Sequence, residues 1–297
     1  MIGVDLGSNS LRMVRIDCET LEILERREWI VRTAEELESS AKIGEEAEKK
    51  ITEALCAIKK EHPDEPMRVV ATAAFRRAQN AHEVIGRIRS ACDVEIEVID
   101  EETESYYAAK GIEYALLRLG KDPQKFLAVD IGGGSTEVIL KHRDEIVAKS
   151  FPVGILTTIQ KYHTKEQILF GIKKQMALVR EHCLDLFEFF GKPKLFVGTG
   201  GTPTTVAALK LGMDYESYDP LRVDGTEISI ADIDAAYKRL LALPKEARAK
   251  LVGVGREDAI IAGLVILREF LDKCGYARMI VIDEGVREGV ALEGCGR

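Results

Sequence analysis

The sequence predicts an α/β protein built from two related domains. Strand-like and helix-like patterns alternate along the chain, and a strand–turn–strand pattern near the N-terminus returns near the middle. The 297 residues also suffice for about two domains that each bury a core. We place the boundary near residue 122, which gives domains over residues 1–122 and 123–297 with a ligand-binding cleft between them.

The N-terminal residues predict a hairpin with a polar bend. An apolar run over residues 2–6 passes through Gly7-Ser8-Asn9-Ser10 into a second apolar run over residues 11–16. Such a bend after Asp5 suits phosphate, because the carboxylate can reach a hydrated divalent cation while glycine admits main-chain N–H donors and serine adds a hydroxyl. One bend of this kind is weak support, since most glycine-containing bends only turn the chain.

The same pattern returns over residues 126–140. There the strand ends in Asp130, the bend reads Gly132-Gly133-Gly134-Ser135, and Glu137 lies on the strand that follows. The two bends align at a displacement of 125 residues, which we interpret as an internal duplication. Two matched bends in separate halves could clamp one phosphate chain between them.

A third glycine-rich bend follows an apolar strand over residues 194–197. It reads Gly198-Thr199-Gly200-Gly201-Thr202, with Thr202 as the expected N-cap of a helix and Pro203 as its first residue. A helix N-terminus suits an anion, although an ordinary tight turn explains the same residues equally well.

Helical patterns fill the remaining segments. The pair Thr164 and Gln167 is a capping-box pattern that opens a long amphipathic helix. The other expected elements are helices over residues 47–58, 101–119, 229–243 and 257–273, a strand over residues 279–282 and a final helix.

Charge and composition exclude several classes of protein. A net charge of −8 argues against a nucleic-acid-binding protein, and no apolar stretch approaches the ~18 residues of a membrane span. The six cysteines are scattered singly, so we expect neither structural zinc nor a disulfide framework. With no secretory signal pattern at the N-terminus, we expect a cytoplasmic protein.

Five strings along nearly the whole chain resemble the exopolyphosphatase and guanosine pentaphosphate phosphohydrolase family. They are Val4–Ser10, Val70–Arg76, Asp130–Glu137, Arg256–Gly263 and Val286–Gly289. The resemblance implies the fold of actin, sugar kinases and chaperone ATPases, in which two ribonuclease H-like domains face each other across a phosphate-binding cleft. It also implies Mg²⁺-dependent removal of terminal phosphoryl groups by water. The chain is similar to short members that lack a C-terminal helical domain.

The resemblance implies a catalytic glutamate at the start of the helix over residues 101–119. Glu104 matches it and would serve as the base for the attacking water. The residues around it depart from the family pattern, which leaves Glu101 and Glu102 as alternatives. Without the resemblance, these acids could equally be a negative first turn that stabilises the helix dipole.

Other site residues follow from the resemblance in the same way. Arg76 matches a family arginine and would hold the reacting phosphate. Glu137, in the second turn, is our own candidate for positioning the water and for binding Mg²⁺ together with Asp130, and an ordinary exposed strand residue is the alternative. For Arg256 and Arg287, which would line the channel, salt bridges are the alternative. The full set expected to bind phosphate is Asp5, Gly7, Ser8, Asn9, Ser10, Arg12, Gly132, Gly133, Gly134, Ser135, Gly200, Gly201, Thr202, Arg256 and Arg287.

The favoured function is that of a phosphohydrolase that releases terminal orthophosphate from inorganic polyphosphate, from guanosine pentaphosphate, or from both. One alternative is a small-molecule kinase of the same fold. The other is a non-catalytic sensor of polyphosphate or guanosine tetraphosphate, which the altered sequence around Glu104 keeps open. We expect no nucleic-acid or membrane partner and include a homodimer among the expectations, although no sequence pattern identifies its surface.

Overall fold

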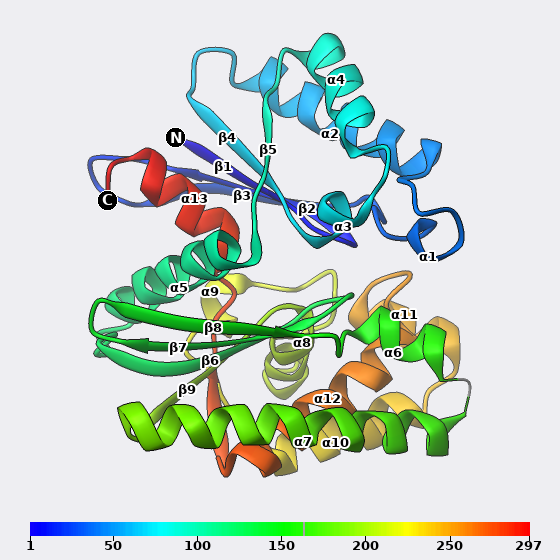
Figure 1. The fold of residues 1–297 in the computed structure, drawn as a ribbon, viewed down its shortest axis with the longest axis vertical. Helices are drawn as coiled ribbons and strands as arrows, with labels where there is room; N and C mark the ends of the chain where they lie inside the picture. Colours follow the sequence, from blue (N-terminus) through cyan, green and yellow to red (C-terminus); the bar gives the residue numbers. More distant parts are fainter. Residues whose placement is uncertain (163) are drawn as a thin grey trace. The chain divides into compact units, whose positions relative to one another are not determined.

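The computed structural model describes residues 1–162 and 164–297, which form two compact units (Figure 1). Unit 1 comprises Met1–Gly111 and Glu284–Arg297, and unit 2 comprises Ile112–Asp283. The first division lies inside helix α5 (Glu101–Arg118). The compact units therefore divide at residues 111 and 284, whereas the sequence predicts a single boundary near residue 122. Sequence periodicity cannot reveal that the last helix packs with the first strands.

Unit 1 is a five-stranded mixed sheet covered by helices. Its strands lie in the order β3-β2-β1-β4-β5, with β2 antiparallel to both neighbours and β1, β4 and β5 parallel. Its elements are β1 (Ile2–Leu6), β2 (Ser10–Ile16), β3 (Ile23–Ile30), α1 (Leu37–Ser40), α2 (Glu45–Glu61), β4 (Met67–Ala71), α3 (Ala73–Arg77), α4 (Ala81–Cys92), β5 (Ile96–Val98), the first part of α5, and α13 (Val286–Gly294).

The two faces of β1 pack against different helices. Val4 is fully buried in a core with Leu55 of α2 and the apolar side of α4. Side chains alternate along a strand, so Gly3 and Asp5 lie on the opposite face. A Cβ on Gly3 would lie 2.3 Å from the carbonyl oxygen of Arg287 in α13. Glycine at this position is what allows the C-terminal helix to lie directly on β1.

Unit 2 repeats this sheet and adds one strand. Its order is β10-β11-β9-β6-β7-β8, in which β8-β7-β6-β9-β11 correspond to β3-β2-β1-β4-β5 with the same strand directions. This correspondence confirms the predicted internal duplication. The elements are the second part of α5, β6 (Lys125–Ile131), β7 (Thr136–His142), β8 (Glu145–Phe151), α6 (Ile155–Lys161), α7 (Lys165–Phe190), β9 (Leu195–Thr199), α8 (Gly201–Lys210), α9 (Pro220–Val223), β10 (Glu227–Ser229), α10 (Ile230–Leu241), α11 (Lys245–Val252), α12 (Ala259–Cys274) and β11 (Arg278–Val281).

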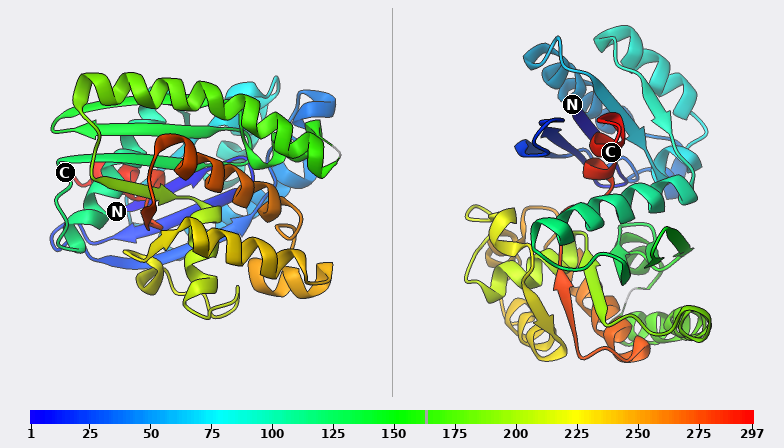
Figure 2. Two further views of the ribbon diagram at one scale, coloured as in Figure 1. Left: turned by 90° about the horizontal axis from the view of Figure 1, so that it is seen from below. Right: turned by 90° about the vertical axis from the view of Figure 1, so that its left-hand side faces the viewer.

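Helices α7 and α12 pack together over one face of this sheet (Figure 2). The predicted capping box opens α7, with the Thr164 hydroxyl accepting from the Gln167 N–H at 3.2 Å. The predicted N-cap of α8 is wrong by two residues. The cap is Gly200, whose φ of +85° turns the chain immediately after β9, so Thr202 already lies within the helix.

Asp224 anchors both ends of unit 2. One carboxylate oxygen accepts from Arg118 at the end of α5 at 2.5 Å, and the other accepts from the main-chain N–H of Asp283 at 2.7 Å. Asp224 is buried, so the guanidinium and the N–H group compensate its charge.

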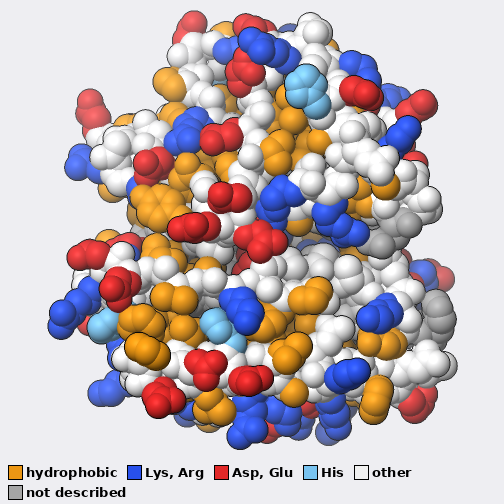
Figure 3. All heavy atoms as spheres, in the orientation of Figure 1, with side chains coloured by type: hydrophobic (Ala, Val, Ile, Leu, Met, Phe, Trp, Pro, Cys, Tyr) orange, Lys and Arg blue, Asp and Glu red, His pale blue; other side chains and the backbone are white. Residues whose placement is uncertain are grey.

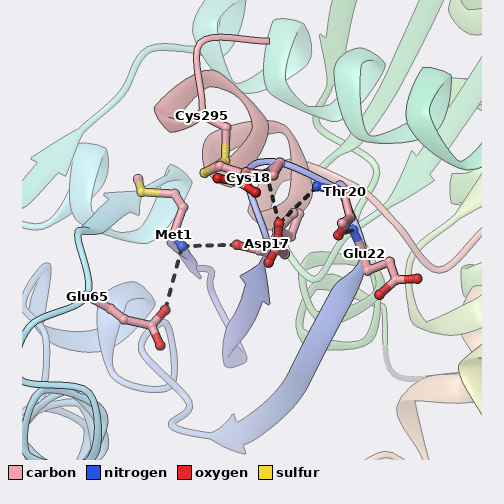
Figure 4. The surroundings of a disulfide bond; sticks show 9 residues. Met1, Asp17, Cys18, Thr20, Glu22, Glu65 and Cys295 are labelled. Atoms are coloured by element: carbon pink, nitrogen blue, oxygen red, sulfur yellow. Dashed lines mark hydrogen bonds and ion pairs between the residues drawn. A yellow bond between two sulfur atoms is a disulfide. The ribbon is translucent and has the colours of Figure 1, made fainter.

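Two disulfides overturn the expectation that the chain has no disulfide framework. Cys18, in the turn between β2 and β3, is bonded to Cys295 just after α13, with a Cα–Cα distance of 5.2 Å (Figure 4). Cys56 of α2 is bonded to Cys92 at the end of α4. The partners are 277 and 36 residues apart in sequence, so their spacing carried no sign of pairing.

The N-terminus lies beside the Cys18–Cys295 bond (Figure 4). The Met1 ammonium donates to the Ile16 carbonyl at 3.0 Å and lies 3.6 Å from a Glu65 carboxylate oxygen. The N–H groups of Thr20 and Glu19 bind the Asp17 carboxylate and lower its pKa. These contacts hold the β2–β3 turn at the end where α13 terminates.

Charged side chains of both signs are interspersed over the face in Figure 3. Among the described residues, none of the helices has both the length and the apolar character of a membrane span.

The Cys18–Cys295 bond closes nearly the whole chain into a loop, which limits the entropy of the unfolded state. We therefore expect Cys18→Ser/Cys295→Ser to lower the free energy of unfolding by about 2–5 kcal/mol. Urea unfolding without reductant measures the loss, with the Cys56→Ser/Cys92→Ser variant, which opens a shorter loop, as the comparison. Equal stability of the first variant and the wild-type protein would contradict a stabilising bond.

Candidate functional site

The two predicted phosphate-binding turns have the same closing hydrogen bond. The Gly7 N–H donates to the Ser10 carbonyl at 3.0 Å, and the Gly132 N–H donates to the Ser135 carbonyl at 2.9 Å. Each turn joins the first strand of its unit to an antiparallel second strand. The repeat seen in the sequence is therefore also a repeat of local geometry.

The residue opposite each strand-end aspartate differs between the units. Asp5 pairs with Arg12 across β1 and β2, whereas Asp130 pairs with Glu137 across β6 and β7. Opposed residues on neighbouring strands project to the same face of the sheet. The unit 1 turn is therefore flanked by one acid and one base, and the unit 2 turn by two acids.

The segment after β3 holds the first turn in place. The N–H groups of Val31 and Arg32 donate to the Asn9 carbonyl at 3.0 and 2.9 Å, and the N–H of Ala34 donates to the Ser8 carbonyl at 2.9 Å. Arg32 has a φ of +54°, which bends the chain toward the turn. Sequence reasoning missed this support, although the strained position at a non-glycine residue marks it in the structure.

Helix α6 holds the second turn in a different way. The N–H of Ile155 donates to the Gly132 carbonyl at 3.0 Å, and the N–H of Leu156 donates to the Gly133 carbonyl at 2.8 Å. A Cβ on Gly154 would lie 2.3 Å from the Gly133 oxygen, so the approach requires glycine. In the part of the chain that the structure describes, the N–H groups of Gly133 and Gly134 have no protein acceptor, which leaves them as donors for an anion.

Two hydroxyls fix the Glu137 carboxylate. Ser135 and Ser150 both donate to the same carboxylate oxygen, Ser150 at 2.9 Å. Ser150 lies directly opposite Glu137 on β8. Sequence reasoning missed Ser150, because the register of β8 on β7 is needed to find it.

The third glycine-rich turn contacts the aspartate of the second turn. A Cβ on Gly200 would lie 2.6 Å from a carboxylate oxygen of Asp130, and β6 and β9 pair Asp130 with Thr199. The Arg256 guanidinium donates to the Gly201 carbonyl at 3.0 Å. The structure therefore brings Asp130, the third turn and Arg256 together within unit 2.

The side chain of Thr202 points toward helix α12 and not into the third turn. Only 1% of Thr202 is exposed, and its hydroxyl oxygen would lie 2.3 Å from a Cβ on Gly263 of α12. Its side chain packs α8 against α12, so the contribution of this residue to an anion site would come from the main chain.

Within unit 1, the structure brings Arg76 and Glu104 together. The Arg76 guanidinium donates to the Glu104 carboxylate at 2.8 Å and to the Ile99 carbonyl at 2.9 Å. The Glu104 side chain is only 19% exposed, whereas Glu101 and Glu102 are exposed. Glu104 is thus the acid of the three that faces the protein.

The start of helix α5 explains why Glu104 is the one of these three acids that faces the protein. The Asp100 carboxylate accepts from the Thr103 N–H at 2.8 Å, which lowers the Asp100 pKa. Asp100 thereby satisfies a main-chain donor in the first turn of α5.

The remaining two arginines of the predicted set make ion pairs in unit 1. Arg12 lies 3.1 Å from Glu28, its cross-strand neighbour on β3. Arg287, on α13, is 6% exposed and lies 2.6 Å from Glu288. A buried guanidinium requires this kind of compensation.

A cluster of metal-ligand type lies elsewhere in unit 1. Glu25, Glu61 and His62 place their ligand atoms within 4.8 Å of one another. Arg27 contacts both glutamates, and Arg15 lies 3.4 Å from Glu25. The two arginines already neutralise these carboxylates, so the cluster is explained as an ion-pair network.

Gly200 offers a direct test of the third turn. We expect Gly200→Ala to lower the free energy of unfolding by about 1–3 kcal/mol, because its φ is +85° and the added Cβ would contact Asp130. Gly134→Ala is the matched control: nothing lies within 4 Å of its Cβ, so stability should change little. Thermal unfolding followed by circular dichroism compares the two variants, and equal stabilities would contradict the packing described.

Comparison with known proteins extends these observations. The model of the Ppx/GppA phosphatase family matches residues 13–296. Exopolyphosphatase 2 of Mycobacterium tuberculosis (strain H37Rv) is 26% identical over 320 residues, covering 99% of this chain and 98% of that protein. The bifunctional 3-dehydroquinate synthase/phosphatase of Fusobacterium nucleatum is 27% identical, covering 98% of this chain and 46% of that protein.

Solved structures agree with the fold. The Aquifex aeolicus member of the Ppx/GppA family is 28% identical with a TM-score of 0.76, covering 99% of this chain and 96% of that chain. An exopolyphosphatase from Cytophaga hutchinsonii, at 22% identity, has a TM-score of 0.83 with the same coverage. These matches confirm the predicted α/β class and the actin-like fold with two domains. The match over nearly the whole chain also confirms the resemblance drawn from the five strings: the chain belongs to the Ppx/GppA phosphatase family.

Proposed function

We propose that this protein releases terminal orthophosphate from inorganic polyphosphate or guanosine pentaphosphate by Mg²⁺-assisted attack of water. The observation that carries the proposal is the pair of matched turns, each with a glycine-to-serine closing bond after a strand-end aspartate. Such turns offer main-chain donors to phosphate oxygens, which a chain of charge −8 needs locally. The name exopolyphosphatase carried by a relative that aligns over 98% of its length supports the same activity.

Glu104 would accept the proton of the attacking water. A general base must lie close to the reacting atoms and be held in a defined orientation. The bond from Arg76 supplies that orientation, while the remaining guanidinium N–H groups are suited to phosphoryl oxygens. Arg76 would then stabilise the charge on the transferred group, which is the main requirement of phosphoryl transfer.

Asp130 and Glu137 are suited to Mg²⁺. The ion prefers oxygen ligands and is usually held by one or two carboxylates together with phosphates and water. Asp130 and Glu137 are cross-strand partners with side chains on one face of the sheet, so this donor set fits. Bound Mg²⁺ would neutralise charge on the phosphate oxygens, and the Ser135 and Ser150 hydroxyls would keep the Glu137 carboxylate in place.

Polyphosphate needs only repeated phosphate sites, whereas guanosine pentaphosphate also needs a pocket for the base. Initial rates of orthophosphate release on the two substrates with Mg²⁺ therefore decide the substrate class. Release that requires ATP and an organic acceptor would replace the proposal with a kinase. Tight binding of guanosine tetraphosphate without turnover of either substrate would replace it with a sensor.

We expect Glu104→Gln and Glu137→Ala each to lower kcat by at least ~100-fold, because each removes a proton acceptor or a charge-positioning group. Orthophosphate release under saturating substrate measures the effect, and circular dichroism checks the fold. Glu101→Gln tests whether a neighbouring acid is the base instead. The Glu101 carboxylate is exposed, so its loss should leave kcat unchanged. The opposite result, loss in Glu101→Gln and a normal rate in Glu104→Gln, would reassign the base.

We expect Ser150→Ala to lower kcat about tenfold with little change in KM, because Glu137 loses a hydroxyl that holds it and about 1.4 kcal/mol corresponds to a factor of ten. Ser150→Thr keeps the hydroxyl and should restore most of the rate. An unchanged kcat in Ser150→Ala would show that the Ser150 hydroxyl is not needed to position the Glu137 carboxylate.

The cytoplasmic location and the homodimer stay predictions. Disulfides are typical of oxidising compartments and of intracellular proteins from hyperthermophiles, so the two bonds weigh against an ordinary reducing cytoplasm.

A further inference from the structure

The last two cysteines form a third close pair, in unit 2. Cys183 lies on α7 and Cys274 is the final residue of α12, and their sulfur atoms are 3.2 Å apart. Both residues are buried. Together with the two disulfides, this contact places all six cysteines of the chain in pairs.

We propose that Cys183 and Cys274 form a third disulfide when the chain folds in the presence of a small-molecule disulfide such as oxidised glutathione. The contacting thiols lie on the two helices that pack together over the sheet of unit 2, so one small approach of the sulfurs completes the bond. The bond would join α7 to the end of α12 covalently.

The chemistry balances as two thiol–disulfide exchanges. The Cys183 thiolate attacks the small disulfide, forms a mixed disulfide and releases one small thiolate. The Cys274 thiolate then attacks the Cys183 sulfur and releases the second. Two protein thiols are oxidised, one small disulfide is reduced, and the two protons from the cysteines end on the two released thiols.

Because Cys183 and Cys274 are buried in the folded protein, whether the disulfide forms depends on whether oxidation comes before or after folding. The contact with Cys183 and desolvation both raise the pKa of the Cys274 thiol, so the reactive thiolate is scarce in the folded protein. Neither sulfur is accessible to a bulky oxidant, because Cys183 is 0% and Cys274 is 4% exposed. We therefore expect the bond to form during folding, while α7 and α12 come together and the thiols are still accessible, and to be protected once the two helices have packed.

The test compares two orders of addition. In one arm, reduced and unfolded protein is refolded in a mixture of reduced and oxidised glutathione. In the other arm, folded and reduced protein is placed in the same mixture. Thiols are then alkylated in denaturant, and peptide mapping by mass spectrometry identifies the linked cysteines.

We expect the first arm to give a Cys183–Cys274 peptide together with the other two pairs, and the second arm to leave both thiols alkylated over the same period. Folded protein with both other bonds closed, but with Cys183 and Cys274 alkylated in the first arm, would overturn the proposal. Linkage of the pair at equal rates in both arms would overturn the claim that folding protects it. If the chain does not refold, folded reduced protein in urea below its unfolding midpoint replaces the first arm, with the same readout and criteria.

A matched pair of variants gives an independent readout. Cys183→Ala/Cys274→Ala removes the proposed bond, and Cys56→Ser/Cys92→Ser removes an established one. In the oxidised wild-type protein, reductant should lower Tm more than it does in Cys183→Ala/Cys274→Ala. If reductant lowers Tm equally in the wild-type protein and in Cys183→Ala/Cys274→Ala, that result contradicts a third bond, because a contact between two thiols does not respond to reductant.

Discussion

One main-chain hydrogen bond determines the geometry on which the candidate site depends. In each unit it runs from the first glycine of the turn to the serine three residues later and closes the turn at the end of the first strand. The closed turn sets the register of the hairpin, and the register decides that Asp5 lies opposite Arg12 and Asp130 opposite Glu137. A one-residue change in the length of either turn would shift the register of its hairpin and turn the side chains of one of the two strands to the other face of the sheet.

The duplicated turns share this bond but differ in what surrounds them. A loop donates to the carbonyl groups of the first turn, whereas a helix N-terminus donates to those of the second. The strand after the first turn carries a base, Arg12, and the strand after the second carries an acid, Glu137, that two hydroxyls hold. The same local scaffold therefore carries different flanking charges in the two units.

Local patterns in the sequence predicted the local structure well. Both turns, the hairpins that carry them and the capping box of α7 followed from residues near one another in the chain. The features that were missed depend on contacts between distant residues. Both disulfides, the support of Glu137 by Ser150 and the packing of α13 on Gly3 are of this kind. The N-cap of α8 was misplaced for a local reason: Thr202 followed by Pro203 is typical of a helix start, but the turn at Gly200, with a φ of +85°, starts the helix two residues earlier.

The Cys18–Cys295 bond makes residues 18–295 a covalent ring (Figure 4). Cleavage of one peptide bond in the ring would open it without separating any fragment, and two cleavages are needed to release a piece. The nicked molecule would gain only the mass of one water molecule, and its pieces would stay together until the disulfide is reduced. A protease that cleaves one exposed loop within residues 18–295 would therefore change the connectivity of the chain without releasing any part of it.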